Sequence, residues 1–216
     1  MVAIVIPAYN EEKTIGEVVK EARKYGKVFV VDDASSDSTA EVARKVGARV
    51  LRQIINQGAG FTTRTGIEAA IASGADIIVT IDADGQHNPK DIPRLISTLT
   101  REKLDIVIGS RNFSKMRFTK RLGNSLIYLT SRILFHVDII DTQSGFKAFR
   151  CGVWNKIKWN SSHYAFCSEI VKNIGINKLR YKEIPIETRL GKEYKGANVF
   201  DGIKIVLKML WWKIWS

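Results

Sequence analysis

The first 110 residues alternate short apolar segments with stretches whose apolar residues recur at helical spacing. Strands are expected at the β-branched runs 2–6, 28–31, 48–51, 77–81 and 106–109. Helices are expected between them, for example where Ile15, Val18, Val19 and Ala22 share one helical face. Strands that alternate with helices of roughly ten to fifteen residues form βαβ units with parallel strands. The sequence therefore predicts an α/β fold, a single Rossmann-like domain with a mostly parallel central sheet.

Polar and acidic residues gather where three of these strands end. They are residues 9–12 after the first strand, which Pro7 is expected to end, Asp32 and Asp33 after the second, and residues 82–86 after the fourth. The carboxyl ends of parallel strands lie at one edge of a sheet, and the loops there form the ligand crevice. The three clusters are therefore expected to meet in one binding site.

Asp82 and Asp84 are candidate metal ligands. Their carboxylates are one residue apart at the end of a strand, so they point the same way out of the sheet edge. Like charges this close raise each other's pKa unless a cation lies between them. With the amide oxygen of Gln86 they form an oxygen set that suits Mg²⁺ or Mn²⁺, which would grip a nucleotide diphosphate. The alternative is an ordinary solvated turn, because short motifs of this kind are weak signals.

Five motifs occur in order along the chain. They are Ile6-Pro7-Ala8-Tyr9-Asn10-Glu11, Val31-Asp32-Asp33-Ala34-Ser35-Ser36-Asp37, Asp82-Ala83-Asp84-Gly85-Gln86-His87, Gly109-Ser110-Arg111 and Asp141-Thr142-Gln143-Ser144-Gly145-Phe146-Lys147. The first three resemble the nucleotide-sugar-binding half of the family 2 inverting glycosyltransferases. The last two narrow the resemblance to the branch of dolichol-phosphate mannose synthase and dolichyl-phosphate glucosyltransferase. The resemblance covers Val2 to about Lys195 and implies a catalytic domain of GT-A type over residues 1–198.

The resemblance implies a role for each nucleotide-site residue. The acidic pair would accept a hydrogen bond from the nucleotide base, with Asp33 as the main candidate and Asp32 as the second. Tyr9 and Glu11, in the motif that begins at Pro7, would line the base and the ribose. Asp82 would lie near the ribose and diphosphate, while Asp84 and Gln86 hold the metal. A simpler role for the acidic pair is to cap the helix that follows, and His87 is expected to be a loop residue.

Basic side chains are expected on the phosphate side of the site. Arg111 follows an apolar strand, so its guanidinium is expected at the active edge, where it can pair bidentately with a phosphate; the alternative is a surface arginine. The resemblance implies further phosphate contacts from the loop after the strand-like run 181–186. Arg189 is the first candidate there, and the choice between Lys192 and Lys195 is open because Gly191-Lys-Glu-Tyr-Lys195 departs from the family's Gly-x-Ser-Lys. Asp141 is expected on the acceptor side, as a base or as a positioning residue.

The net positive charge of the chain comes from its second half. The formal net charge is +12, with 20 Lys and Arg against 7 Asp and Glu in residues 111–216, and 14 against 15 in residues 1–110. Such a basic half suits nucleic acid or an anionic membrane, and the sequence shows no recognised nucleic-acid motif. Each surface Lys or Arg near an anionic bilayer contributes about 1 kcal/mol of attraction. The composition therefore favours a membrane-surface protein that does not bind nucleic acid.

Residues 199–216 are expected to form an amphipathic helix that lies in the membrane interface. Its apolar run contains Lys204, Lys208 and Lys213, and Trp211, Trp212 and Trp215 are of the type found at the headgroup boundary. The alternatives are a helix docked on its own domain, or a chain that continues into a transmembrane extension. No signal peptide is recognisable, and the two cysteines indicate no disulfide framework, so the cytoplasmic face of a membrane is the expected location.

These features predict a metal-dependent enzyme that makes a lipid-linked sugar for glycosylation. It would transfer a hexose from a nucleotide diphosphate sugar to a polyprenyl or dolichyl phosphate, with Asp141, Arg111 and Arg189 as catalytic residues. GDP-mannose is the favoured donor, and UDP-glucose or UDP-N-acetylglucosamine the alternative. A nucleotidyltransferase would also use paired carboxylates and Mg²⁺, but the loop after the first strand is acidic rather than Gly-rich and basic. A non-enzymatic nucleotide-binding membrane adaptor is the remaining alternative.

Overall fold

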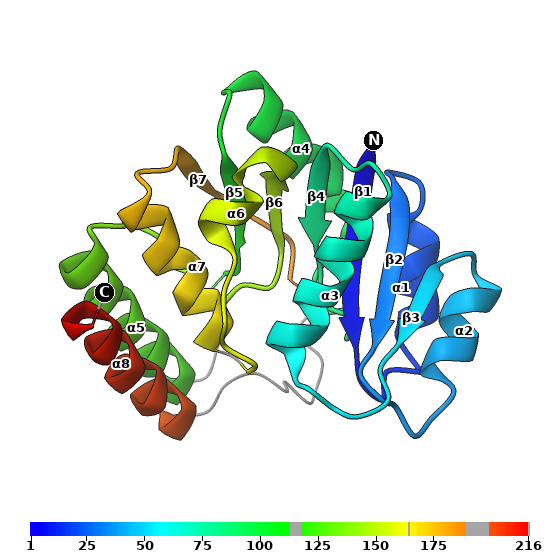
Figure 1. Cartoon of the computed structure of the whole chain (residues 1–216), viewed down its shortest axis with the longest axis horizontal. Helices are drawn as coiled ribbons and strands as arrows, with labels where there is room; N and C mark the ends of the chain where they lie inside the picture. Colours follow the sequence, from blue (N-terminus) through cyan, green and yellow to red (C-terminus); the bar gives the residue numbers. More distant parts are fainter. Residues whose placement is uncertain (113–117, 164, 189–198, 216) are drawn as a thin grey trace.

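A computed structural model describes residues 1–112, 118–163, 165–188 and 199–215, so Arg189, Lys192 and Lys195 lie outside the described residues. The strands are β1 (Val2–Ala8), β2 (Lys27–Asp32), β3 (Arg49–Arg52), β4 (Ile77–Thr80), β5 (Ile106–Ser110), β6 (Lys147–Arg150) and β7 (Tyr181–Pro185). They form one sheet in the order β3-β2-β1-β4-β6-β5-β7 (Figure 1). Only β6 runs antiparallel to its neighbours β4 and β5 among these pairs. The predicted α/β fold with a mostly parallel sheet is confirmed.

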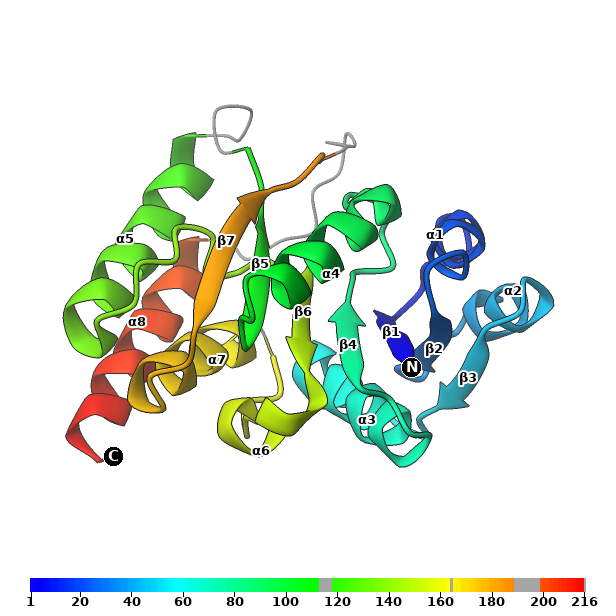
Figure 2. The same cartoon turned by 90° about the horizontal axis from the view of Figure 1, so that it is seen from above.

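Helices cover both faces of the sheet. They are α1 (Ile15–Ala22), α2 (Thr39–Lys45), α3 (Ala59–Ala72), α4 (Ile92–Arg101), α5 (Phe118–Phe135), α6 (Trp154–Ile157), α7 (Ala165–Ile176) and α8 (Val199–Ile214). Figure 2 shows α1 and α4 on one face and α3, α6 and α7 on the other. In β1, Ala3 and Val5 belong to the core on the α3 side, whereas Ile4 and Ile6 belong to the core on the α1 side. Burial on both faces explains why the central strands are continuously apolar.

Pro7 does not end the first strand, contrary to the sequence prediction. β1 continues through Pro7 to Ala8, which pair with Val31 and Asp32 of β2. The pairing of β1 with β4 ends at Val5 and Thr80. Pro7 is tolerated because the ladder on the β4 side has already ended, so its missing N–H removes no hydrogen bond from that pairing.

Strand β6 brings the fifth motif into the site. Because β6 is antiparallel to β4 and β5, its first residue, Lys147, lies at the edge where those strands end. Residues 141–146 therefore lie between the ends of β4 and β5. The hydroxyl of Thr80 on β4 donates to the backbone carbonyl of Gly145 over 2.7 Å, which fixes this segment against the sheet.

Helix α8 packs beside α5 and α7 at one end of the molecule (Figure 1). Its Ile205, Met209 and Trp212 are buried, so one side of the helix packs on its own domain and Trp212 cannot meet a headgroup in this arrangement. The other side of the helix is exposed and apolar, with Ile203, Leu207, Leu210, Trp211, Ile214 and Trp215. None of the described helices has the length and apolar character needed to cross a membrane.

Candidate active site

Asp82 and Asp84 follow β4 at the carboxyl edge of the sheet. Oδ1 of Asp84 accepts a hydrogen bond from the Gln86 N–H over 2.9 Å, which turns the loop back on itself. Burial and the neighbouring Asp82 charge raise the pKa of Asp84 to about 6. The pKa of Asp82 is also raised, first by burial, although 43% of its side chain is exposed, while Arg111 and Lys147 oppose the rise. Both groups are thus disfavoured as free anions in the absence of a cation.

This oxygen set fits a hard divalent cation. Across the described residues, no group of three or more His, Cys, Asp and Glu side chains gathers as a metal cage. Asp82 and Asp84, with the mostly buried Gln86, would therefore provide few protein ligands and leave positions for water and phosphate oxygens, as Mg²⁺ sites commonly do. A cation between the two carboxylates would relieve the unfavourable charge that raises their pKa values.

Three buried polar atoms at this edge have no hydrogen-bond partner within the described part of the chain. They are His87 Nδ1, Thr188 Oγ1 and Asp32 Oδ2, the last of which forms an ion pair with Arg52 Nε over 3.2 Å. His87 Nδ1 lies 3.3 Å from Asp82 Oδ2 without hydrogen-bond geometry, and burial together with the Arg111 charge lowers the pKa of His87 to about 4. Because buried polar groups in proteins are nearly always hydrogen-bonded, unsatisfied atoms gathered at one edge indicate a place for a ligand or water.

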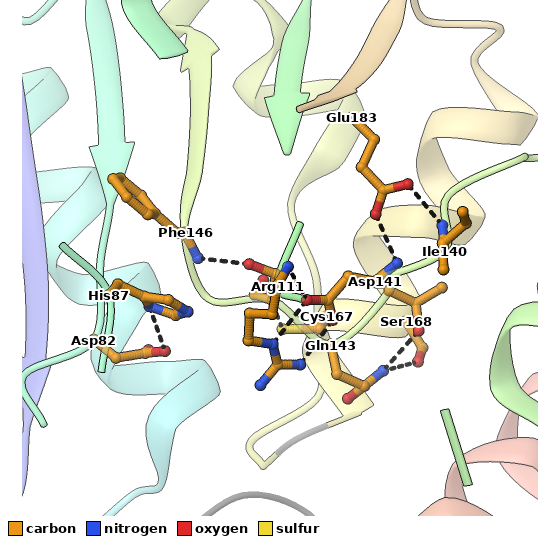
Figure 3. A network of polar contacts seen from close by, with 12 residues as sticks. Asp82, His87, Arg111, Ile140, Asp141, Gln143, Phe146, Cys167, Ser168 and Glu183 are labelled. Atoms are coloured by element: carbon orange, nitrogen blue, oxygen red, sulfur yellow. Dashed lines mark hydrogen bonds and ion pairs between the residues drawn. The ribbon is translucent and has the colours of Figure 1, made fainter. Parts of the chain in front are cut away.

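Arg111 and Asp141 form one buried unit. Asp141 Oδ2 accepts hydrogen bonds from the backbone N–H of Arg111 over 3.0 Å and from its Nε over 2.7 Å, and Oδ1 accepts from Nη2 over 2.7 Å (Figure 3). Asp141 is fully buried, and only 7% of the Arg111 side chain is exposed. Because both Asp141 oxygens are engaged by the same guanidinium, this geometry favours a positioning role for Asp141 over a role as base.

The pair faces the metal-ligand candidates across the site. Figure 3 shows Asp82 and His87 on one side and Arg111 with Asp141 on the other. The charge of Arg111 reaches both sides, since it opposes the rise in the pKa of Asp82 and, after burial, contributes to the lowered pKa of His87. A diphosphate between the two sides would be neutralised by a cation from one direction and by a guanidinium from the other.

Asp33 has a structural task that the sequence did not reveal. Its Oδ1 accepts a hydrogen bond from the Gln57 N–H over 2.8 Å, and its Oδ2 accepts from the Gly58 N–H over 2.9 Å. Asp32 accepts from the Ser35 N–H over 3.2 Å and pairs with Arg52, whose Nε lies 3.2 Å from Oδ2. Both carboxylates are buried. Asp33, the main candidate for contact with the nucleotide base, has both oxygens hydrogen-bonded to backbone N–H groups.

The first two motifs lie side by side. The Asn10 N–H donates to Ser35 Oγ over 2.9 Å, and Asn10 Oδ1 accepts from the Ser36 N–H over 2.9 Å. Glu11 accepts from the Thr14 hydroxyl over 3.0 Å. Tyr9 is 49% exposed at the end of β1, so its ring is available to a ligand. The structure thus brings Pro7, Tyr9 and Glu11 together with the acidic pair.

Two charged residues in or next to the site were missed by the sequence analysis. Lys147 is 2% exposed, donates to the Ser144 carbonyl, and lies 3.5 Å from Cys167 Sγ. It was visible as the last residue of the fifth motif but received no role. Glu183, on the edge strand β7, accepts backbone hydrogen bonds from Ile140 and Asp141. No signal identified Glu183, because an acidic residue in an edge strand is most simply a solvated one.

Comparisons with known proteins identify a family and several named relatives. The model of the family Glycosyl transferase family 2 matches residues 3–158. A UDP-N-acetylglucosamine–dolichyl-phosphate N-acetylglucosaminyltransferase of Methanococcus voltae is 32% identical over 99% of this chain and 96% of its own length. A dolichol-phosphate mannosyltransferase of Pyrococcus furiosus is 28% identical over 98% of this chain and 64% of its own length.

The fold has solved counterparts. Glucosyl-3-phosphoglycerate synthase of Mycobacterium tuberculosis, crystallised with Mn²⁺, UDP-glucose and phosphoglyceric acid, aligns with a TM-score of 0.77. The alignment covers 97% of this chain and 79% of that chain, at 21% sequence identity. At that identity the likeness establishes the shared fold and leaves substrates open.

Proposed function

The chain belongs to glycosyl transferase family 2, and on that premise we propose that it transfers a sugar from a nucleotide diphosphate sugar to a polyprenyl phosphate of the dolichyl type. The observation that carries the proposal is the placement of Asp82, two residues before Asp84 in the loop after β4, opposite the Arg111–Asp141 pair at one edge of the sheet. Carboxylates for a cation on one side and a buried guanidinium on the other suit a reaction whose leaving group is a diphosphate.

The acceptor explains why the site can do without a strong base. A phosphate monoester is already an anion near neutral pH, so one of its oxygens can attack the anomeric carbon directly. The new bond joins this oxygen to the anomeric carbon, the bond to the donor diphosphate breaks on the opposite side, and the nucleoside diphosphate leaves. Bound Mg²⁺ or Mn²⁺, held by Asp82, Asp84 and Gln86, would supply charge neutralisation for the leaving group. Arg111 supplies a second positive charge, in an orientation fixed by Asp141.

The remaining site residues take roles around this centre. Asp32 is the better acceptor for a base N–H, because its Oδ2 has no hydrogen bond among the described residues and Asp33 is engaged by two backbone amides. Arg52, which covers Asp32, would have to move aside. Arg189 and Lys195 remain proposed phosphate contacts. In support, the chain enters their loop from Thr188, which pairs with His87 beside Asp82.

UDP-N-acetylglucosamine is the first donor to test. The Methanococcus voltae relative that is named for this donor aligns with almost the whole of both chains. GDP-mannose, the donor favoured in the sequence analysis, is the second, because the named mannosyltransferase aligns at lower identity and over less of its own length. A carboxylate can accept an N–H from either base, so the described site residues are compatible with both.

The lipid acceptor is expected to be reached at an anionic membrane surface, on its cytoplasmic face. Helices α5 and α8 lie side by side, and their exposed sides are together called the α5–α8 surface. Its apolar residues are Leu122, Leu126, Leu129 and Ile133 on α5 and Leu207, Leu210, Trp211, Ile214 and Trp215 on α8. Exposed Arg121, Arg132, Lys204 and Lys213 lie on the same two helices. Apolar residues with flanking cations are typical of helices that lie in a bilayer interface.

A transfer assay tests the proposal. The purified chain is incubated with MnCl₂, vesicles that contain dolichyl phosphate, and labelled UDP-N-acetylglucosamine, UDP-glucose or GDP-mannose in turn. Label should move into the lipid phase with one donor, and EDTA or Asp84→Asn should prevent it. Phosphoglyceric acid serves as a matched water-soluble acceptor. Transfer to that acceptor, with no lipid product from any donor, would contradict the proposal.

A further inference from the structure

Glu183 holds the backbone of the Asp141 segment from outside the site. It lies on β7, in register with Ile108 of β5. Its Oε1 accepts a hydrogen bond from the Asp141 N–H over 2.7 Å, and its Oε2 accepts from the Ile140 N–H over 3.0 Å (Figure 3). Two successive amides thus converge on one carboxylate, so both the position and the direction of the chain at residues 140 and 141 are fixed.

Asp141 is consequently held at both ends. Its amide is fixed by Glu183 on β7, and its carboxylate is fixed by Arg111, which directly follows β5. A second contact from β7 supports the same segment, since the Asp138 N–H donates to the Tyr181 hydroxyl over 2.8 Å. A shift of the segment would move the Asp141 carboxylate, and the Arg111 fork would have to follow it or lose its two parallel hydrogen bonds.

We propose that Glu183 is a positioning residue for the transfer reaction, and that it acts through Asp141 to hold Arg111 at the phosphate site. The kinetic part of this inference rests on the proposed function, whereas the structural part does not. A carboxylate is suited to the task because it offers two acceptor oxygens and no donor, which matches two backbone N–H groups. Glu183 itself contacts neither the carboxylates after β4 nor the guanidinium in the described hydrogen bonds.

Variants at Glu183 test the inference. Glu183→Ala removes both acceptors, and Glu183→Gln keeps one carbonyl oxygen. Lys182→Ala is the matched control, because Lys182 neighbours Glu183 on β7 but pairs with Glu102 at the surface. With the donor that supports transfer, kcat/KM should fall by roughly 10- to 100-fold for Glu183→Ala, as expected for a displaced catalytic group, and less for Glu183→Gln. Lys182→Ala should stay within about twofold of the parent, as a surface change away from the site.

A double-mutant comparison separates positioning from a general structural effect. In an Asp141→Asn background, Glu183→Ala should cause little further loss of kcat/KM, because the group that Glu183 positions has already been impaired. An equal fold-loss in both backgrounds would overturn the inference.

Hydrogen–deuterium exchange of a peptide that spans residues 136–146 provides a readout independent of turnover. Glu183→Ala should speed exchange there and leave the peptide over α3 unchanged, whereas unchanged exchange at residues 136–146 would overturn the structural part. If the parent chain transfers no sugar, the proposed function fails and the exchange result still decides whether Glu183 holds the segment.

Discussion

The backbone of Gly145 runs directly against the Asp82 carboxylate, so closely that a β-carbon at position 145 would overlap both carboxylate oxygens. The fifth motif therefore limits the position of Asp82, a metal-ligand candidate in the loop after β4, as well as forming the acceptor side. Gly145 is needed here for its lack of a side chain.

Gly145→Ala should lower activity with little loss of stability. The atoms in the way belong to the end of a side chain, so Asp82 can turn aside at low cost to the fold, but it then leaves its position in the site. We expect kcat/KM to fall by roughly 100-fold, and the Mn²⁺ concentration that gives half-maximal activity to rise. Gly152→Ala is the control, because no atom lies within 4 Å of a β-carbon there. Unchanged kinetics in Gly145→Ala would remove Asp82 from the site.

Asp84→Asn should stabilise the metal-free protein at neutral pH. The pKa of Asp84 in the folded protein is raised to about 6. Its favourable contribution to the free energy of unfolding is therefore fully present below the ordinary pKa of a carboxyl group and is lost as the pH rises through 6. Asparagine removes the buried charge and keeps an oxygen for the Gln86 N–H. In EDTA, the melting temperature of Asp84→Asn should exceed that of the parent at pH 7.5, with a smaller difference at pH 4.5.

Added Mn²⁺ should reverse that order, because the parent carboxylate gains a cation that the amide cannot bind as well. Glu68→Gln, at an exposed position on α3, controls for the loss of one negative charge. A parent protein that is more stable than Asp84→Asn in EDTA at pH 7.5 would show that the Asp82–Asp84 pair is already compensated within the chain.

The sequence was a good guide to those parts of the molecule that depend on local pattern. Six of the seven strands were predicted, five of them from β-branched runs and the sixth from the strand-like run 181–186, because each could be recognised from its own residues. Strand β6 was missed because Lys147–Arg150 is short and contains no β-branched residue, and only its two neighbours make it a strand. Pairing of this kind depends on contacts between segments that are far apart in the sequence, so a local pattern does not reveal it.

The same reason limits what could be predicted of the site. Residues 32–33 and 82–86 were placed correctly at one sheet edge, because strand ends follow from the fold. That Asp33 binds the backbone of residues 57–58, or that Asp141 engages Arg111, depends on contacts between segments far apart in the chain. Trp211 and Trp212 are likewise adjacent residues of the same type. Only the packing of α8 against α5 and α7 determines that the Trp212 ring is buried and the Trp211 ring exposed.

Breaking the Arg111–Asp141 pair should cost stability as well as activity. Arg111→Met leaves a fully buried carboxylate without its guanidinium, and loss of one partner of a buried pair costs about 3–5 kcal/mol. The double variant Arg111→Met with Asp141→Leu removes both charges, so its free energy of unfolding should recover most of that loss while transfer stays abolished. Denaturant unfolding and the transfer assay measure the two effects.

Arg111→Lys provides the intermediate case, since lysine keeps the charge but loses the planar fork, and its activity should be restored only in part. Near-normal turnover in Arg111→Met would place this guanidinium outside the chemistry. A double variant no more stable than Arg111→Met would show that packing, and not the unpaired charge, dominates at this position.

The α5–α8 surface makes the membrane proposal testable residue by residue. Deleting residues 199–216 is not a clean test, because it would also remove the buried Ile205, Met209 and Trp212 and uncover α5 and α7. Trp211→Ser with Trp215→Ser changes only rings that are 58% and 74% exposed. A large apolar side chain that leaves water contributes about 1.5–3 kcal/mol, so the loss of both should weaken sedimentation with anionic liposomes at least tenfold.

A control variant and the salt dependence distinguish binding through this surface from nonspecific adsorption of exposed apolar side chains. Ile54→Ser removes an isoleucine that is 97% exposed in the β3–α3 loop, and it should leave liposome binding unchanged. Raising the salt concentration should weaken binding of the parent without abolishing it, because screening acts on the Lys and Arg contribution and not on apolar burial. Transfer to dolichyl phosphate in vesicles should fall with liposome binding in the double Trp variant, whereas the melting temperature should not. Equal liposome binding by the parent and the double Trp variant at low salt would assign the exposed side of α8 no part in reaching the lipid acceptor.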